Sequence, residues 1–196
     1  MPLPKVMQAS QLPAVAIPLL PRTAATLRSA GGVAPGKTLG FVMQHQLQTN
    51  WCWAGVAAST SAFYLPTTTW TQCQVVTLQL GDPTCCNNPC PTHCNRDGFL
   101  DQALSATGNL VTWGSQLLLF SQIQLEIGIN RPVAFRIGWN GGGGHFLAVT
   151  GFKDNGLQQT VDVKDPWYGD STVVYNDLLT SYQGNGTCTH HYYTKP

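Results

Sequence analysis

One stretch of the sequence, residues 46–59, most constrains how this chain can fold. It reads QLQTNWCWAGVAAS, so a run of small apolar residues follows a single cysteine, Cys52. Asn50 is a residue type that favours the N-cap of a helix. Residues 51–64 can then form a helix whose alanines allow close packing. The stretch predicts a buried helix with Cys52 in its first turn.

Cys52 has chemical reasons to be reactive at that position. The unpaired backbone N–H groups and the positive dipole end of a helix N-terminus favour a thiolate over a thiol. Gln46 lies six residues upstream, near enough for its side-chain amide to reach the same place. A thiolate with a nearby amide donor supplies a nucleophile and an oxyanion stabiliser for acyl transfer. The alternative is that Cys52 is a small buried residue at a helix start, because buried cysteine is common.

The composition restricts the class of protein. Charged residues make up 10% of the 196 residues and the formal net charge is +1, whereas ordinary globular chains contain about 25% charged residues. A nucleic-acid partner would need a basic patch, and a membrane span would need about 18 consecutive apolar residues. We therefore expect one domain or one compact two-lobed unit, without a nucleic-acid or membrane partner, and take it to be a monomer.

Six cysteines accompany Cys52, and four of them crowd into residues 85–94. An even set can form three disulfides, which stabilise a fold and imply an oxidising compartment. The same run is rich in soft metal ligands, but zinc motifs usually separate two ligand pairs by about a dozen residues. We expect disulfides, no metal, no cofactor and a secreted or extracytoplasmic protein. The disulfide candidates are Cys73, Cys85, Cys86, Cys90, Cys94 and Cys188.

The chain divides into a proline-rich segment with almost no charge over residues 1–36 and a folded domain over residues 37–196. We interpret the first as an extended arm, propeptide or export region. In the domain, helices are predicted first and antiparallel strands afterwards, which is typical of an α+β protein with two segregated parts. The predicted helices are 51–64, 70–80, 98–107 with Asp97 as its cap, 117–127 and 177–182. The predicted strands are 132–139, 145–152, 160–164, 171–175 and 188–194.

A thiolate nucleophile needs a base and a group that orients the base. His145 opens an apolar strand directly after four glycines, a position that suits access rather than filling a core. Asp165 follows 20 residues later, which fits a hairpin with both residues at one end. We expect Asp165 to hold the imidazole by Nδ1–H and Trp167 to shield that bond from water. The alternatives are a structural histidine and an Asx turn at Asp165.

These residues resemble the papain-like cysteine peptidases, and the resemblance covers about residues 36–196. In that family a glutamine six residues before the nucleophile lies in the oxyanion hole, and tryptophan follows the cysteine. The likeness is closer to short bacterial branches, namely bacteriocin-leader-processing peptidases and plant-pathogen effector cysteine proteases. It rests on residues in a fixed order: Gln46, Cys52-Trp53, Gly144-His145-Phe146 and Asp165-Pro166-Trp167.

The resemblance implies a two-lobed fold, with a helical N-terminal lobe that carries the nucleophile helix and an antiparallel β C-terminal lobe. It implies a cysteine endopeptidase that cleaves a protein or peptide substrate through an acyl-enzyme intermediate. The implied catalytic residues are Cys52, His145, Asp165 and Gln46, and the implied binding residues are Trp53, Trp167 and Gly144.

The sequence also departs from the plant and lysosomal papains. The Cys-Gly-x-Cys-Trp signature is absent, and Cys52 and His145 are separated by 93 positions rather than roughly 130–150. The substrate-binding loops must therefore differ. Other interpretations are a transglutaminase or amidase with the same triad, a disulfide-stapled binding domain without enzymatic activity, and a metal-binding module.

Overall fold

The structure is a computed structural model that describes residues 35–196. The predicted arm, propeptide or export region over residues 1–36 lies outside the described residues except for its last two. Gly36 already belongs to the first strand. The boundary between residues 36 and 37 stays a prediction.

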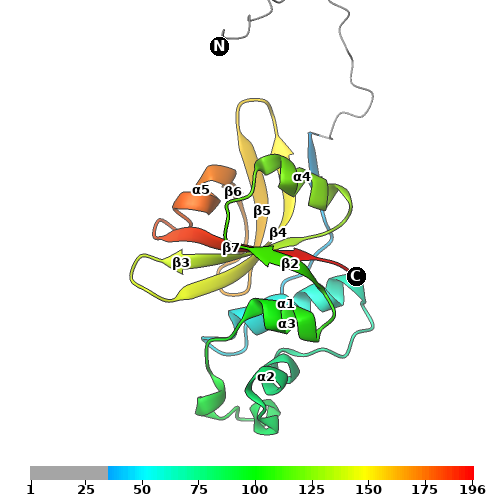
Figure 1. Ribbon diagram of the computed structural model, residues 1–196, viewed down its shortest axis with the longest axis vertical. Helices are drawn as coiled ribbons and strands as arrows, with labels where there is room; N and C mark the ends of the chain where they lie inside the picture. Colours follow the sequence, from blue (N-terminus) through cyan, green and yellow to red (C-terminus); the bar gives the residue numbers. More distant parts are fainter. Residues whose placement is uncertain (1–34) are drawn as a thin grey trace, which may run out of the picture. The chain divides into compact units, whose positions relative to one another are not determined.

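Most helices precede most strands of an antiparallel sheet, which confirms the predicted α+β fold class (Figure 1). The helices are α1 (Cys52–Tyr64), α2 (Gln72–Leu80), α3 (Leu100–Ala106), α4 (Phe120–Gly128) and α5 (Tyr175–Thr180), with short 3-10 turns η1 (Pro83–Cys86) and η2 (Thr92–Cys94). The strands are β1 (Gly36–Thr38), β2 (Leu110–Gly114), β3 (Val133–Trp139), β4 (Gly144–Asp154), β5 (Gln159–Asp165), β6 (Gly169–Val174) and β7 (Gly186–Thr194). The pattern did not predict β2, whose side chains are mostly exposed.

The seven-stranded sheet has the order β2-β7-β3-β4-β5-β6, and β1 pairs with β4. The tight hairpin between β3 and β4 pairs Ile137 with His145 and Gly138 with Gly144. Strand β5 runs antiparallel to β4 and ends at Asp165, which pairs with Gly169 at the start of β6. Because β4 and β5 are antiparallel, the beginning of β4, with His145, lies beside the end of β5, with Asp165.

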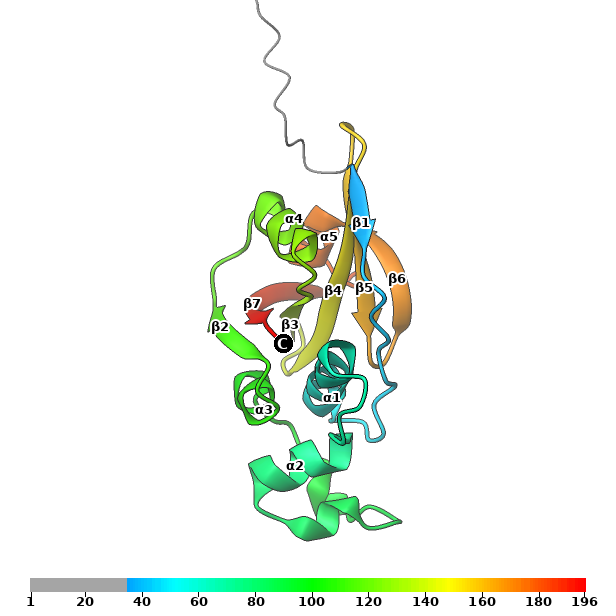
Figure 2. The same cartoon turned by 90° about the vertical axis from the view of Figure 1, so that its right-hand side faces the viewer.

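Two hydrophobic cores lie in the described part of the chain. The first joins the sheet to α4 and α5. The second joins α1, α2 and α3 to a smaller patch of sheet that includes Ala134, Phe146 and Tyr192. Figure 2 shows α1, α2 and α3 grouped together, with α1 beside the sheet. The interface between α1 and the sheet is where Cys52 and His145 meet.

Helix α1 ends at Tyr64 as predicted but begins one residue later, at Cys52, because the predicted cap is wrong. Trp51 occupies the N-cap position and makes no side-chain capping bond. Asn50 instead pairs with Asn95: its backbone N–H donates to the side-chain oxygen at 2.9 Å, and its amide donates to the backbone carbonyl at 3.0 Å. Asp97 does not cap α3, because that helix begins only at Leu100. Asn50, which was expected to cap α1, is therefore bonded to the loop before α3.

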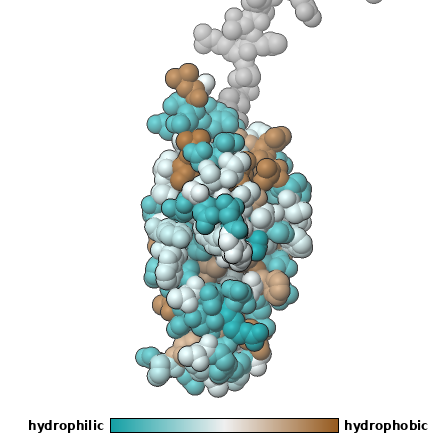
Figure 3. Space-filling model, turned by 90° about the vertical axis from the view of Figure 1, so that its left-hand side faces the viewer, coloured by the Kyte–Doolittle hydropathy of each residue, from teal (hydrophilic) through white to brown (hydrophobic). Residues whose placement is uncertain are grey.

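The molecular surface reflects the low charge of the chain. The face in Figure 3 is mostly hydrophilic or intermediate, and hydrophobic residues form small separate groups on it. Within residues 35–196, no helix combines the length and apolar character needed to cross a membrane.

Candidate active site

Small residues allow α1 to approach the turn that follows β5. Gly55 lies one turn after Cys52, and a Cβ at this position would meet Pro166 at 3.3 Å. The backbone N–H of Gln46 also donates to the Pro166 carbonyl at 2.9 Å. Cys52 is buried at the start of α1. The first turn of α1 is therefore held close to the segment that carries Asp165.

His145 has two polar partners. Its Nε2 lies 2.8 Å from Asp165 Oδ1, and both side chains are buried. The Cys52 thiol lies close enough to the ring to help raise the pKa of His145. The expectation that Asp165 holds Nδ1–H is wrong: Nε2 faces the carboxylate, which leaves Nδ1 as the ring nitrogen available to Cys52. Cys52, His145 and Asp165 thus form one contiguous chain of polar contacts.

Asp165 combines the two arrangements that its sequence allowed. Its Oδ1 accepts the backbone N–H groups of Trp167 at 2.7 Å and Tyr168 at 2.8 Å, as in an Asx turn. The same oxygen faces His145, while Oδ2 accepts the Tyr182 hydroxyl at 2.8 Å. The carboxylate is therefore fixed by three donors besides the imidazole, so it cannot rotate without losing hydrogen bonds.

The charges of this pair support each other. Burial of His145 disfavours the imidazolium, but the hydrogen bonds to Asp165 and Cys52 outweigh it and raise the pKa of His145 from 6.5 to about 9. Burial also acts to raise the pKa of Asp165, yet His145 and the Tyr168 and Trp167 N–H groups lower it overall. Burial and the nearby Asp165 raise the pKa of Tyr182, which keeps its hydroxyl a donor. The site favours an imidazolium beside a carboxylate.

Two aromatic rings contact His145, but the predicted one, Trp167, is not among them. Trp139 stacks on the imidazole with ring centroids 6.0 Å apart, and Tyr168 meets it edge-on at 5.9 Å. Trp167 is half-exposed and stacks on His45 instead. Trp139 was not among the predicted residues, although its position at the end of β3, just before the turn into β4, was a signal. Trp139 and Tyr168, rather than Trp167, are therefore the aromatic rings that contact His145.

Gln46 is buried beside the start of α1, and both N–H donors of its amide are occupied. Its Nε2 donates to the carbonyls of Gln48 at 2.9 Å and Thr49 at 2.7 Å. Its Oε1 is buried without a hydrogen-bond partner. In this arrangement Gln46 shapes the loop that leads into Cys52. An oxyanion would have to draw one of these N–H groups away from a backbone carbonyl.

A cavity of about 530 Å³ opens beside Cys52. Trp53 and Gly144, two of the predicted binding residues, lie on its wall, whereas Trp167 does not. The remaining lining residues were not predicted to line a binding site, because they come from five separate parts of the chain. They are Asp97, Gly98, Phe99, Asp101, Trp113, Arg136, Gly143, Phe146, His190 and Tyr192. The wall mixes aromatic rings with two carboxylates and one guanidinium, so the cavity suits a side chain with both apolar and polar parts.

Four of the six candidate cysteines form two disulfides. Cys73 is bonded to Cys86, and Cys85 is bonded to Cys94. The prediction of a third disulfide is wrong, because Cys90 and Cys188 are free thiols that belong to different cores. Burial raises the pKa of Cys188 to about 12, which makes it unreactive.

The metal alternative for this region has a partial geometric basis. Ligand atoms of Asp82, Cys85 and Cys94 lie within 4.8 Å of one another. Both sulfur atoms are joined in a disulfide, however, so neither is a thiolate that could bind a metal.

The fold resembles that of papain-like cysteine peptidases of known structure. A structure of digestive procathepsin L 3 from the larval midgut of Tenebrio molitor matches with a TM-score of 0.53 and 14% identity, covering 85% of this chain and 72% of that one. A structure from a study of antibody cross-reactivity between the mite allergens Blo t 1 and Der p 1 matches with a TM-score of 0.53 and 11% identity, covering 87% and 74%. At these identities the likeness shows the fold alone.

The sequence itself identifies the family. Residues 36–184 match the model of the papain-like cysteine protease AvrRpt2 family, so the chain belongs to that family. The predicted resemblance to papain-like cysteine peptidases is confirmed, and the protein is a cysteine protease. Membership favours peptide-bond hydrolysis over the transglutaminase, amidase and non-enzymatic interpretations. A search of curated protein sequences found no match.

Proposed function

We propose that the protein is an endopeptidase that works through a triad of Cys52, His145 and Asp165. The Cys52 thiolate attacks the scissile carbonyl, and His145 protonates the leaving amine. Asp165 orients the imidazole and stabilises its positive charge. Water then hydrolyses the acyl-enzyme, with His145 as the base. The observation that carries the proposal is His145, a buried imidazole that pairs with Asp165 and lies close enough to Cys52 for the thiol to help raise its pKa.

The oxyanion of the tetrahedral intermediate would be held by the Cys52 backbone N–H and the Gln46 side chain. Helix α1 begins at Cys52 without a side-chain cap, so the N–H groups of its first turn are not taken by a capping residue. Gln46 donates to Gln48 and Thr49 in the present arrangement. The proposed role therefore requires one N–H of Gln46 to exchange a carbonyl for the oxyanion as the intermediate forms.

The substrate is a protein or peptide, and we propose that its side chain next to the scissile bond enters the cavity beside Cys52. Trp53 and Gly144 would line that subsite. We further propose a secreted or extracytoplasmic, bacterial, monomeric enzyme, with residues 1–36 as an arm, propeptide or export region. The two disulfides support an oxidising compartment.

The experiment that tests the function compares the native protein with Cys52→Ala. Each is incubated with a mixture of unstructured peptides, and new peptide ends are identified by mass spectrometry. We expect cleavage by the native protein and none by Cys52→Ala. Cys90→Ala, which changes a free thiol outside the proposed triad, serves as the matched control and should cleave like the native protein.

Cleavage by Cys52→Ala would overturn the triad. A transglutaminase would instead incorporate an added primary amine into glutamine side chains without producing new peptide ends. The same mass spectra distinguish the two reactions.

A further inference from the structure

The two residues next to Cys52, Trp51 and Trp53, are both hydrogen-bonded to one short segment, residues 94–96. The Trp51 indole N–H donates to the Cys94 carbonyl at 2.8 Å. The Trp53 indole N–H donates to the Arg96 carbonyl at 3.2 Å. These two tryptophans flank the nucleophile directly, so the segment supports the first turn of α1 from both sides of Cys52.

The loop that leads into Cys52 is bonded to the same segment. Asn95 accepts the Asn50 backbone N–H at 2.9 Å and the Asn50 amide at 3.0 Å. Its own amide donates to the Thr49 hydroxyl at 2.8 Å. Residues 49–53 and 94–96 thus form a continuous hydrogen-bonded pair of segments, although about 45 positions separate them along the chain.

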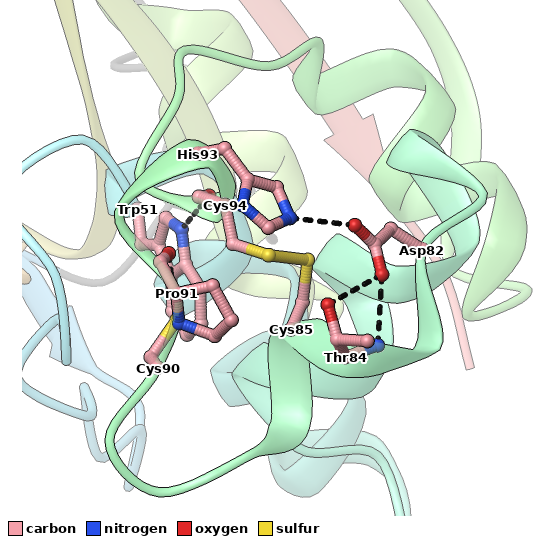
Figure 4. Close-up of polar contacts among 8 residues, drawn as sticks. All are labelled: Trp51, Asp82, Thr84, Cys85, Cys90, Pro91, His93 and Cys94. Atoms are coloured by element: carbon pink, nitrogen blue, oxygen red, sulfur yellow. Dashed lines mark hydrogen bonds and ion pairs between the residues drawn. A yellow bond between two sulfur atoms is a disulfide. The ribbon is translucent and has the colours of Figure 1, made fainter.

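The segment is held in turn by the Cys85–Cys94 disulfide (Figure 4). Both cysteines are buried against the core that contains Trp51 and Cys52. Next to the disulfide, His93 Nε2 lies 2.7 Å from Asp82 Oδ2. Asp82 also accepts the Thr84 N–H and hydroxyl, and these bonds, together with His93, lower its pKa to about 2. A disulfide at Cys94 and a polar contact at His93 therefore hold this segment to residues 82–85.

The second disulfide offers a natural comparison. Cys73–Cys86 joins α2 to η1, and its sulfur atoms contact the hydroxyls of Thr71 and Thr77. Within residues 35–196, neither Cys73 nor Cys86 is hydrogen-bonded to residues 49–53 or 94–96. The two disulfides span 13 and 9 positions, so their effects on the entropy of the unfolded chain should be similar.

We propose that the Cys85–Cys94 disulfide is a positioning element for the nucleophile: by fixing residues 94–96 it holds the first turn of α1, and so keeps the Cys52 sulfur within reach of His145. The proposal rests on the function of Cys52 proposed above. The Cys73–Cys86 disulfide, by contrast, stabilises the fold without positioning the site. Displacement of a reacting group by about 1 Å can lower a rate by about 100-fold, so a loosened segment should affect turnover more than substrate binding.

The test compares C85S/C94S with C73S/C86S, each measured well below its melting temperature on a peptide that the native protein cleaves. We expect similar losses of thermal stability in the two variants. We expect kcat of C85S/C94S to fall by about 10- to 100-fold with KM nearly unchanged, and alkylation of Cys52 by iodoacetamide to slow as well. C73S/C86S should keep the native kcat and alkylation rate.

Equal values of kcat in the two variants would overturn the proposal, as would a native kcat in C85S/C94S. If C85S/C94S does not fold, Trp51→Phe provides the second test, because it removes the N–H donor to the Cys94 carbonyl and keeps a smaller aromatic ring in the core. It should lower kcat several-fold, and an unchanged kcat would contradict the proposal. Continued cleavage by Cys52→Ala would instead refute the proposed function, so the two failures are distinguishable.

Discussion

The two parts of the proposed active site are held in place by different means. The strand part carries His145 and Asp165, and the hydrogen-bond ladder of β3, β4, β5 and β6 sets their positions. The helical part carries Cys52, and side-chain bonds to residues 94–96 support it. Many backbone hydrogen bonds hold the strands of the ladder, whereas a few specific side-chain contacts hold the nucleophile. Disruption of the strand part should therefore affect charge and protonation, and disruption of the helical part should affect placement.

The largest expected effect comes from the strand part. His145→Gln should lower kcat by about 10²- to 10⁴-fold, because the general acid and base is lost. The glutamine amide can still donate to Asp165, but the charged pair is lost, so the melting temperature should fall as well while the protein still folds. Peptide cleavage at several enzyme concentrations and a thermal melt measure the two quantities. Turnover within a few-fold of native would show that another group carries the proton.

A smaller loss is expected for Gln46→Ala in the helical part. Removal of one oxyanion donor should lower kcat by about 10²- to 10³-fold, while the rate of Cys52 alkylation stays close to native. Gln48→Ala is the matched control, because Gln46 bonds to the backbone carbonyl of residue 48, which the substitution keeps. If alkylation slows as much as hydrolysis does, Gln46 acts by shaping the loop and not on the oxyanion.

The pH dependence separates charge from placement. Asp165→Asn removes a partner that raises the pKa of His145 from 6.5 to about 9, so the alkaline limb of kcat/KM should move from about 9 toward 6.5. Activity at lower pH should stay within a few-fold of native, because the remaining oxygen can still accept from His145 Nε2. A pH–rate profile from 5 to 10, roughly, covers both limbs. An alkaline limb that does not move would mean that Asp165 does not set the charge of His145.

The same pair makes a signed prediction for stability. His145 has a raised pKa in the folded state, so its contribution is fully present below pH 6.5 and is lost as the pH rises through about 9. Denaturant unfolding at pH 6 and at pH 9, roughly, should therefore show a loss of stability at the higher pH. The free energy of unfolding of Asp165→Asn should fall less over the same pH range. An equal loss in both proteins would assign the effect to other groups.

The smallest effect on chemistry, and a clear one on stability, is expected at Gly98. A Cβ there would meet the Trp53 ring at 2.3 Å, so Gly98→Ala should destabilise the fold by about 1–3 kcal/mol through overpacking. Gly128→Ala is the control, because a Cβ at Gly128 meets nothing within 4 Å. Chemical denaturation measures both. A neutral Gly98→Ala would show that Trp53 can move, which would weaken the case for a rigid frame around Cys52.

Local patterns predicted the elements well where one physical cause dominated. The alanine-rich run after Cys52 predicted α1 because few other structures bury such residues, and the β-branched runs predicted β3 to β7. Strand β2 was missed because its exposed side chains give no periodic signal. The cap of α1 was misjudged because Asn50 pairs with Asn95, a distant residue that the sequence does not place nearby.

The candidate site was predictable only in part for the same reason. Cys52, His145 and Asp165 carry chemistry that their residue types reveal, and the structure brings them together. The ring nitrogen that faces Asp165 and the aromatic partners of His145 depend on side-chain geometry between strands. The cysteine pairing likewise depends on which core each residue joins, which explains why Cys188 stays apart from the loop.

The measurement that tests the central claim most directly is identification of the thiol that supports catalysis. The native protein has three free cysteines in its described part, Cys52, Cys90 and Cys188. We predict that substoichiometric iodoacetamide labels Cys52 first and that peptide cleavage falls in proportion to the fraction labelled. Full labelling of Cys52 with cleavage retained, or loss of cleavage that follows labelling of Cys90, would contradict the assignment of Cys52 as the nucleophile.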